Sequence, residues 1–465
     1  MKTNIEQAIS AATTPEPSVN GHAKHPPTIQ SDKAPQNLKD VGLIRALADA
    51  ITSENHFAQD VGGKVYVFRR GVYADRGEPE IKRAVKRLCN KWGISAKWSP
   101  RLACDVAEYI RVDSRKLWDK PPLDFINVEN GLLGVADMVL LPHSPEHLSP
   151  VQLPITYDPD ATCPRTERFY GEVLPPDTVE VAFEVVAWLM LPHTSIQQAV
   201  LMLGEGSNGK STMLRQWERF LGKSNVSALS LHKLEGDKFS VARLVGKLAN
   251  ICPDLPSAHL ESTSVFKALT GFDTVTGERK FQESFDFVSY ARLVFSANHP
   301  PRSKDASHAF FRRWYPFPFG RTFGADAIPR EVLDAELSSP QELSGLLNKA
   351  LAALPRLARG HFTETASVKQ AWEEFRATTD PLAVWLDHNT IDDPSSVWVE
   401  KGRLISIFNK AATQKGVPAM TNTAFGLALK RLRPKVTEAQ RTTSAGVKWA
   451  YIGIGLADEP TTEGG

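Results

Sequence analysis

The sequence has little cysteine and almost no net charge. Its four cysteines, Cys89, Cys104, Cys163 and Cys252, lie far apart, and no two of them have the spacing of zinc ligands. This usage argues against a disulfide-stabilised secreted domain and is typical of a reducing compartment. Lys and Arg total 55 against 53 Asp and Glu, a net charge of +2, so any surface for a polyanion must be local.

Long apolar runs are also missing. No segment approaches the roughly 20 apolar residues of a membrane-spanning helix, and the N-terminus lacks a charged-then-apolar signal pattern. We therefore predict a cytoplasmic protein with no membrane partner. Residues 1–38 contain almost no large apolar side chains, so they cannot offset chain entropy by burial, and we expect a disordered leader. A chain of 465 residues suits two to four domains.

The most informative stretch is residues 204–211, an unbroken G-x-x-x-x-G-K-[ST] phosphate-binding loop. Glycines let backbone N–H groups approach phosphates, Lys210 would reach the β- and γ-phosphates, and the Ser211 hydroxyl would ligate Mg²⁺. An apolar run at 199–203 precedes the loop, and 212–217 open a helix whose N-terminus faces the anion. The sequence thus predicts a nucleoside triphosphate with Mg²⁺. The residues expected to hold it are Gly204, Glu205, Gly206, Ser207, Asn208, Gly209, Lys210, Ser211 and Thr212.

Two polar residues that follow apolar runs are candidates for the chemistry beyond the loop. Asp254 comes after the run 248–252 and Pro253, where it could orient Mg²⁺ or the attacking water. The alternative is a turn aspartate without a chemical role. Asn298 ends the run 292–297, and its amide could hold the attacking water, although asparagine often ends strands for local reasons.

Basic residues among aromatics form two further candidates. Arg312 and Arg313 follow two phenylalanines and precede Trp314. They are either a stacked structural pair or an arginine finger that neutralises transition-state charge across a subunit boundary. Residues 276–287 predict a hairpin in which Arg279 and Lys280 either contact a phosphate backbone or only face solvent.

The secondary-structure pattern indicates an α/β nucleotide-binding core over 198–325, where strands and helices alternate. Residues 64–73 predict a pair of strands. Helical patterns are found at 80–92, 100–118, 179–191, 329–359 and 364–379. The C-terminal region has helices at 381–388, 400–414 and 421–433, then strands at 436–442 and 448–454, an order typical of a winged helix.

Five candidate features follow one another over about 110 residues: the phosphate-binding loop, Asp254, the predicted hairpin, Asn298 and the arginine pair. In this order the chain resembles the superfamily 3 helicases, AAA+ motors of viruses, phages and plasmids, and most of all the phage and plasmid primase-helicase branch. The loop, with Asn208 before Gly-Lys, is similar to the Walker A motif of that branch. Residues 267–281 resemble the motif leading into its pre-sensor hairpin, 295–301 its sensor 1, and 311–319 its arginine-finger segment.

The resemblance extends to both ends. Residues 130–133 and 153–164 resemble the helicase-associated N-terminal domain, and the expected winged helix resembles the C-terminal domain of the family. The implied fold is an α/β AAA+ P-loop core with an α+β N-terminal domain and a C-terminal winged helix. The implied organisation is a disordered leader at 1–38, the N-terminal domain at 39–175, the ATPase domain at 176–362, a linker helix at 363–379, the winged helix at 380–455 and a disordered tail at 456–465.

Superfamily membership would imply a ring, expected to be a hexamer, that binds ATP and Mg²⁺ between subunits and moves 3′ to 5′ on single-stranded or forked DNA. One subunit would supply Lys210, Ser211, Asp254 and Asn298. The next would supply Arg312 or Arg313. Arg313 is favoured because it is the more regular of the pair in this family. The hairpin would line the central channel, with Arg279 or Lys280 gripping one strand.

The winged helix would give a second DNA contact through its third helix and its wing. Winged helices also mediate protein contacts, and this alternative stays open. Trp449 and Tyr451 are expected to pack rather than stack on bases. The basic residues expected to contact DNA are Lys430, Arg431, Arg433 and Lys448.

Two departures from the family pattern matter. Many members carry two adjacent Walker B acids, whereas here Pro253 precedes the single Asp254. The leader is too short and polar for a primase domain, so we expect any priming to come from a separate primase or initiator protein. Both features keep open a second interpretation, an ATPase ring that loads or remodels replication partners without processive unwinding. A small-molecule P-loop kinase is disfavoured by the tandem arginines and by the lack of an acceptor-pocket motif.

Overall fold

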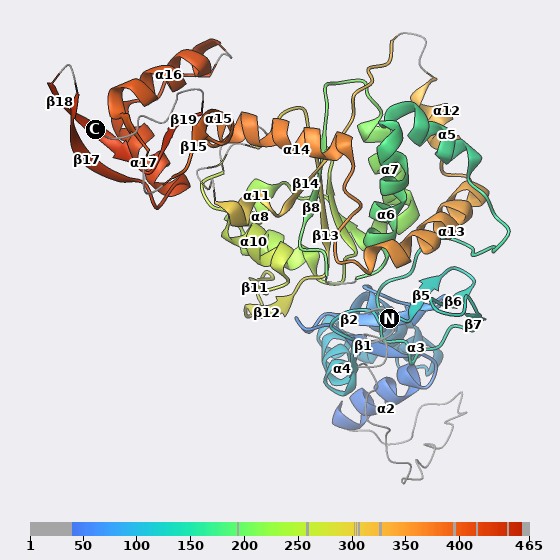
Figure 1. Cartoon of the computed structure of the whole chain (residues 1–465). Helices are drawn as coiled ribbons and strands as arrows, with labels where there is room; N and C mark the ends of the chain where they lie inside the picture. Colours follow the sequence, from blue (N-terminus) through green and yellow to red (C-terminus); the bar gives the residue numbers. More distant parts are fainter. Residues whose placement is uncertain are drawn as a thin grey trace.

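The computed structural model describes residues 40–192, 195–256, 260–301, 303, 305, 307–324, 328–393, 397–414, 417–443 and 446–457. The predicted leader at 1–38 lies outside these residues, as does most of the predicted tail at 456–465. Three parts follow one another along the chain: an N-terminal part, a central core, and a C-terminal part that is joined to the core by helix α14 (Ala366–Thr379) (Figure 1).

The N-terminal part contains a sheet of order β3-β2-β1-β4, with three helices against one face. The strands are β1 (Phe57–Gln59), β2 (Val65–Arg69), β3 (Val72–Ala74) and β4 (Arg115–Lys116). The helices are α2 (Asp40–Thr52), α3 (Gly77–Lys91) and α4 (Pro100–Asp113). Alternation along β2 places Val65 and Val67 on the helix side and Tyr66 in a small cluster with Tyr73 and Leu148. A second sheet consists of β5 (Phe125–Val128), β6 (Gly131–Gly134) and β7 (Leu140–Leu141).

The helix predicted at 100–118 is too long. Helix α4 ends at Asp113, because Ser114 is extended and its hydroxyl donates to the carbonyl of Ile110 at 2.6 Å. The chain then forms β4, which pairs in parallel with β1. The pair of strands predicted at 64–73 is confirmed as β2 and β3.

The central core contains a five-stranded sheet of order β14-β8-β13-β10-β9, and every neighbouring pair is parallel. The strands are β8 (Ala199–Leu203), β9 (Val226–Ser227), β10 (Ala249–Cys252), β13 (Arg292–Ala297) and β14 (Trp314–Pro318). Most strand residues are buried, as expected for a parallel sheet with helices on both faces. This confirms the predicted α/β class.

Helices cover both faces of this sheet. One face carries α5 (Pro164–Val173), α6 (Val179–Met190), α7 (Lys210–Leu221) and α13 (Pro340–Leu357), with α12 (Arg330–Glu336) against α7. The other face carries α8 (Leu231–Gly236), α9 (Lys238–Val241), α10 (Ser264–Gly271) and α11 (His308–Phe311). The single helix predicted at 329–359 is therefore found as two helices, α12 and α13.

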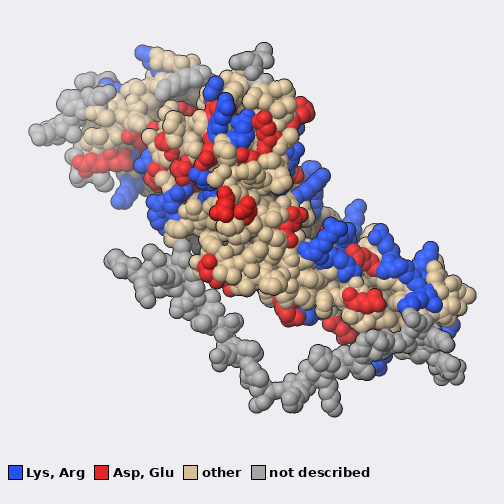
Figure 2. All heavy atoms as spheres, turned by 90° about the vertical axis from the view of Figure 1, so that its right-hand side faces the viewer, with Lys and Arg blue, Asp and Glu red and all other residues tan. Residues whose placement is uncertain are grey.

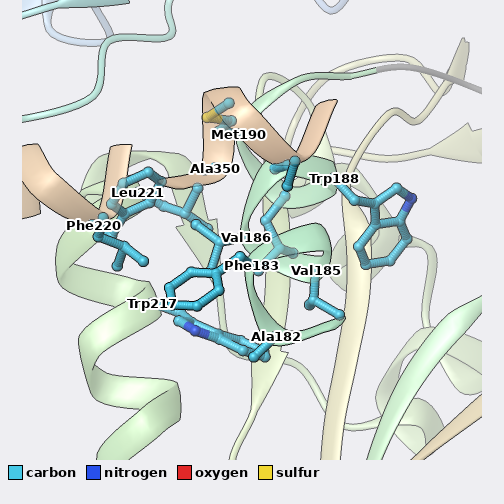
Figure 3. Packing of buried hydrophobic residues seen from close by; sticks show 14 of the residues in the cluster. Ala182, Phe183, Val185, Val186, Trp188, Met190, Trp217, Phe220, Leu221 and Ala350 are labelled. Carbon is cyan, nitrogen blue, oxygen red and sulfur yellow. The ribbon is translucent and has the colours of Figure 1, made fainter. Parts of the chain in front are cut away.

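Helix α6 is the centre of the larger cluster because all residues from Val181 to Met190 are buried. All of these residues except Glu184, whose carboxylate accepts from Arg356 and Thr363, are apolar, and a helix of this kind belongs inside a protein. Figure 3 shows Phe183 and Val186 of α6 directed toward Trp217 of α7 and Ala350 of α13. The core of α6, α7 and α13 thus fixes the start of α7, which carries the loop lysine.

The predicted hairpin at 276–287 is confirmed as β11 (Thr274–Gly277) and β12 (Phe285–Val288), an antiparallel pair. It projects from the central core toward the N-terminal part (Figure 1). Its turn residues, 278–284, contact the N-terminal part through Arg279, which is described with the site below.

The C-terminal part has the predicted order of three helices followed by a hairpin. The helices are α15 (Pro381–Asn389), α16 (Lys401–Gln414) and α17 (Asn422–Leu432). Strands β16 (Trp398–Glu400), β18 (Gly446–Ile452) and β17 (Thr437–Thr443) form an antiparallel sheet in that order. Leu456, the first residue of the predicted tail, instead ends β19 (Gly455–Leu456), which pairs with β15 (Thr390–Ile391). Tyr451 packs in the core as expected, whereas Trp449 is 53% exposed and lies against Lys401.

Within the described part of the chain, no helix has both the length and the apolar character needed to cross a membrane.

Candidate nucleotide site

The carboxyl ends of β8, β13 and β10 meet at one edge of the central sheet, because the three strands are parallel neighbours. The loop at 204–209 follows β8 and Asn298 follows β13, while Asp254 comes after β10 with Pro253 between them. The strand order therefore places the amide between the loop and the acid. All three line one cleft of about 800 Å³, at the position where open α/β sheets bind ligands.

The loop needs glycine at two positions. Gly204 has a φ of 153°, and a Cβ there would lie 2.4 Å from the side-chain nitrogen of Asn208 and 2.5 Å from the carbonyl oxygen of Phe319. Gly209, with a φ of 90°, is the left-handed N-cap of the 12-residue helix α7. The free N–H groups at the start of α7 consequently face the cleft, which favours an anion there.

Lys210, the first residue of α7, is buried and points back into the loop. Its Nζ donates to the carbonyl oxygens of Gly204 and Glu205, the latter at 3.0 Å, and to Oδ1 of Asn208 at 3.1 Å. Burial lowers the pKa of the lysine. Nδ2 of Asn208 is buried and has no hydrogen-bond partner among the described residues. Asn208 thus orients the lysine with one atom and keeps a free donor on the other.

Asp254, Asn298 and Ser211 are exposed on the cleft, where each can reach a ligand. A hydroxyl and a carboxylate oxygen suit Mg²⁺, which binds through one or two such groups together with substrate phosphates and waters. No group of three or more metal-ligating side chains was found in the described ranges.

The arginine pair lies at the opposite edge of the sheet. Strand β14 runs parallel to β8 with Trp314 beside Ala199, so Arg312 and Arg313 precede the amino end of β14. Five residues of strand, about 16 Å, separate this edge from the loop edge. The structure does not bring either arginine to the cleft of its own chain.

The two arginines differ in environment. Arg313 is only 9% exposed, and its Nη1 donates to the carbonyl oxygen of Ala309 at 2.7 Å. Burial, and secondarily the charge of Arg312, lower its pKa. Arg312 is exposed to solvent.

Sequence reasoning missed the cleft residues supplied by the segment after β14. Phe319 N–H donates to the carbonyl oxygen of Leu203 at 2.9 Å, and Phe323 N–H to that of Ser207 at 2.8 Å, so this segment lies along the loop. Arg321 lines the cleft, with its guanidinium 4.8 Å from the ring centroid of Phe323. The signal was present, because Arg321 follows a strand whose carboxyl end must lie at the same sheet edge as the loop.

A second missed residue, Arg165, comes from α5. Its Nε binds Glu336 at 2.7 Å, while both terminal nitrogens are buried without a partner among the described residues. No sequence signal pointed to it, since residues 39–175 were assigned to the N-terminal domain. In the structure, α5 packs with α6 and α13 beside the loop.

Of the two hairpin cations predicted to contact DNA, Arg279 is held by a carboxylate. Its guanidinium donates to both oxygens of Asp60, at 3.0 and 2.7 Å, and Asp60 is buried in the N-terminal part. Its Cζ also lies 5.0 Å from the ring centroid of Phe285. Lys280 is exposed, next to the fully exposed Phe281 at the turn.

Three of the four predicted C-terminal cations are paired within their own part. Arg431 binds Asp380 at 2.7 Å, Arg433 binds Asp387 at 2.6 Å, and Lys448 lies 3.8 Å from Glu400. Lys430 is exposed on α17. The predicted DNA contact of this part therefore stays a prediction, and most of its cations already have a counter-ion.

Comparison with known proteins gives two matches to family models. Residues 41–175 match the family described as D5 N terminal like, and residues 202–313 match a family of unknown function, DUF5906. Domains of these two kinds are typical of phage and plasmid primase-helicase proteins. The matched regions include the N-terminal part and, in the central core, the loop, the acid and the amide.

Solved structures share the fold. Two apo structures of the C-terminal region of NrS-1 (305–718) align with TM-scores of 0.52 and 0.50, each at 12% identity, covering 90% of this chain and 100% of the other. At this identity the likeness concerns the fold alone. A search of curated proteins finds no match. The two family matches, and not the structural likeness, suggest a replication-associated protein of the primase-helicase type.

Proposed function

We propose that the chain is an ATP-dependent DNA helicase of phage or plasmid replication, acting as a ring, expected to be a hexamer, on single-stranded DNA. One observation carries the proposal. Loop, acid and amide share a cleft at one edge of the parallel sheet, while the arginine pair lies at the other edge. A chain with this arrangement has the parts of a nucleotide-hydrolysing site but needs a second copy to join them.

Within one subunit, the cleft residues have separable roles. Lys210 exchanges its bonds to the loop carbonyls for bonds to the β- and γ-phosphates, and the backbone N–H groups of α7 add to that cradle. Mg²⁺, when bound with ATP, neutralises phosphate charge. Ser211 and Asp254 are the residues that would hold it. Asn298, between loop and acid, orients the attacking water, and Arg321 supplies a positive charge from the same chain.

The neighbouring subunit supplies the arginine. An exposed guanidinium at the sheet edge far from its own loop can face the cleft of a second copy without rearrangement of the core. A guanidinium in that position stabilises the charge that develops on the transferred phosphoryl group. The geometry favours Arg312 for this contact, because Arg313 is buried and bonded to Ala309.

DNA contact is proposed for the hairpin β11–β12, whose Lys280 and Phe281 are exposed at the turn. A cation and an aromatic ring side by side suit a phosphate and a base of a single strand. The C-terminal part, proposed as a winged helix, would add a contact through Lys430. Movement from 3′ to 5′ is proposed from the resemblance to superfamily 3.

A second candidate function is an ATPase ring that loads or remodels replication partners without processive unwinding. The observation in its favour is the number of cations that are already neutralised. Arg279, Arg431 and Arg433 are bound to carboxylates rather than open to DNA.

Strand displacement on forked DNA tests the proposal. We expect ATP-dependent unwinding of a fork with a 3′ single-stranded tail, and none by Lys210→Ala, which lacks the phosphate-binding ammonium. A ring that hydrolyses ATP on single-stranded DNA yet displaces no strand, whatever the tail, would support the second candidate and refute the first. Light scattering with and without nucleotide should show an oligomer.

A further inference from the structure

A basic surface lies on the N-terminal part, on elements that contribute nothing to the nucleotide cleft. Residues 81–104 contain seven Lys and Arg and no Asp or Glu, in a chain whose total charge is only +2. Lys and Arg side chains gather over this part of the molecule (Figure 2, lower right). Such a concentration of one sign is the local polyanion surface that the overall composition leaves room for.

Helix periodicity places these cations together. In α3, Ile81, Ala84, Val85 and Cys89 face the core of the N-terminal part. At 100° per residue, Arg83, Lys86 and Arg87 fall on the opposite side and are exposed. The segment that follows adds the exposed Lys97, Trp98 and Arg101. We call the surface formed by Arg83, Lys86, Arg87, Lys97, Trp98 and Arg101 the α3 basic face.

The cations of this face differ from most of the other predicted DNA contacts in having no carboxylate partner among the described residues. Lys82, at its border, pairs with Glu78 at 2.6 Å. In contrast, across the described ranges no carboxylate lies within ion-pair distance of Arg83, Lys86, Arg87, Lys97 or Arg101. This differs from Arg279, Arg431 and Arg433, which are bound to carboxylates. Unpaired surface cations can bind an external anion without first breaking an ion pair.

An aromatic ring lies among these cations. Trp98 is 38% exposed, and the ammonium of Lys86 lies 5.2 Å from its ring centroid. A partly exposed ring with a cation over it can bind a nucleotide, because the exposed part of the ring stacks on a base while the cation binds the adjoining phosphate. Duplex DNA keeps its bases stacked on one another, so the ring favours a single strand.

We propose that the α3 basic face binds single-stranded DNA, as a site separate from the hairpin β11–β12 and from the C-terminal part. Arg83 and Arg87 are one helical turn apart, about 6 Å along the axis, so they reach different phosphates. Trp98 stacks on a base. Binding here needs neither ATP nor its hydrolysis, so this proposal and the proposed helicase activity can fail independently.

The test measures binding of a fluorescent oligothymidine to the full chain without nucleotide, in the Lys210→Ala background. The variant Arg83→Glu/Lys86→Glu/Arg87→Glu is compared with Lys120→Glu/Lys223→Glu/Lys369→Glu, which changes the net charge equally at exposed positions elsewhere. We expect the first to weaken binding at least about tenfold and to lower the salt slope by about 2, and the control to change it less than about twofold. Equal affinities for the two triple variants would overturn the proposal.

Two further arms keep the result interpretable. Thermal melting verifies that the charge reversals leave the fold intact, as does DNA-independent ATP hydrolysis measured with Lys210 restored. If the charge-reversed variant is unstable, Arg83→Gln/Lys86→Gln/Arg87→Gln replaces it in the binding measurement. Trp98→Ala should weaken binding of the oligothymidine about tenfold and leave binding of a blunt duplex unchanged. If Trp98→Ala changes the affinity for both nucleic acids equally, or for neither, the assignment to a single strand is contradicted. If the face retains an acidic peptide instead of DNA, it is a protein-binding surface and the proposal is overturned.

Discussion

At the scale of single residues, the cations of this chain divide by what already holds them. Lys210 is held by oxygens of its own loop, which a phosphate can replace. Arg313 is buried with one bond to a helix carbonyl, whereas its neighbour Arg312 is exposed. Environment, rather than residue type, therefore decides which arginine can act outside the chain.

This difference predicts distinct effects of two substitutions. Arg312→Ala should lower kcat for ATP hydrolysis by about 10³-fold, the effect of losing an arginine finger, with an unchanged melting temperature. Arg313→Ala should lower the melting temperature by several degrees, since it empties a buried position and leaves the carbonyl of Ala309 without its partner. Steady-state kinetics and thermal melting of both variants measure this. The reverse pattern, with Arg313→Ala inactive but fully stable, would identify Arg313 as the finger.

At the scale of elements, hairpin β11–β12 is tied to the N-terminal part by one ion pair. Asp60 accepts from both terminal nitrogens of Arg279 and also from the N–H groups of Gly62 and Lys64, at 2.9 and 3.0 Å. The pair is largely buried, so removing one partner would leave an unpaired buried charge, which is costly. The hairpin is thereby fixed to a part of the chain distant in sequence.

Asp60→Asn should release the hairpin and raise the affinity for single-stranded DNA several-fold, because Arg279 becomes free to bind a phosphate. Arg279→Gln is the matched control. It breaks the same pair but removes the cation, so it should not raise the affinity. Fluorescence anisotropy of a labelled oligonucleotide measures both variants, and an equal gain in affinity for both would show that Arg279 itself does not contact DNA.

Sequence patterns predicted which helices and strands form, but they did not predict how these elements pack against one another. Strand alternation and the loop motif correctly located β8, the hairpin and the order of elements in the C-terminal part. The end of α4 was missed because it depends on Ser114 turning the chain into a strand that pairs with β1, a contact 57 residues away. For the same reason Arg165 was missed, since helix α5 joins the loop only through tertiary packing against α6 and α13.

At the scale of the whole molecule, charge is balanced overall but divided among the parts. Seven cations and no acid occupy residues 81–104, so the near-zero total conceals a strongly basic surface. The presence of the loop, Asp254 and Asn298 in one cleft was predictable, because each follows a strand and the ends of parallel strands meet at one edge of the sheet. The arginine pair lies at the other edge because β14 runs parallel to β8, and it was not foreseen because the run that forms β14 was interpreted only as an aromatic segment after the arginines.

In the proposed mechanism two subunits complete each nucleotide site, and mixing two inactive variants is a direct test. Lys210→Ala lacks the phosphate-binding ammonium, and Arg312→Ala/Arg313→Ala lacks both candidate fingers. In rings assembled from an equal mixture, one interface in about four joins an intact loop to an intact arginine pair. With random mixing of the two variants, the arginine-finger mechanism predicts that ATP hydrolysis returns to about a quarter of the wild-type rate. Mixed rings that form but stay as inactive as their parents would contradict the shared site.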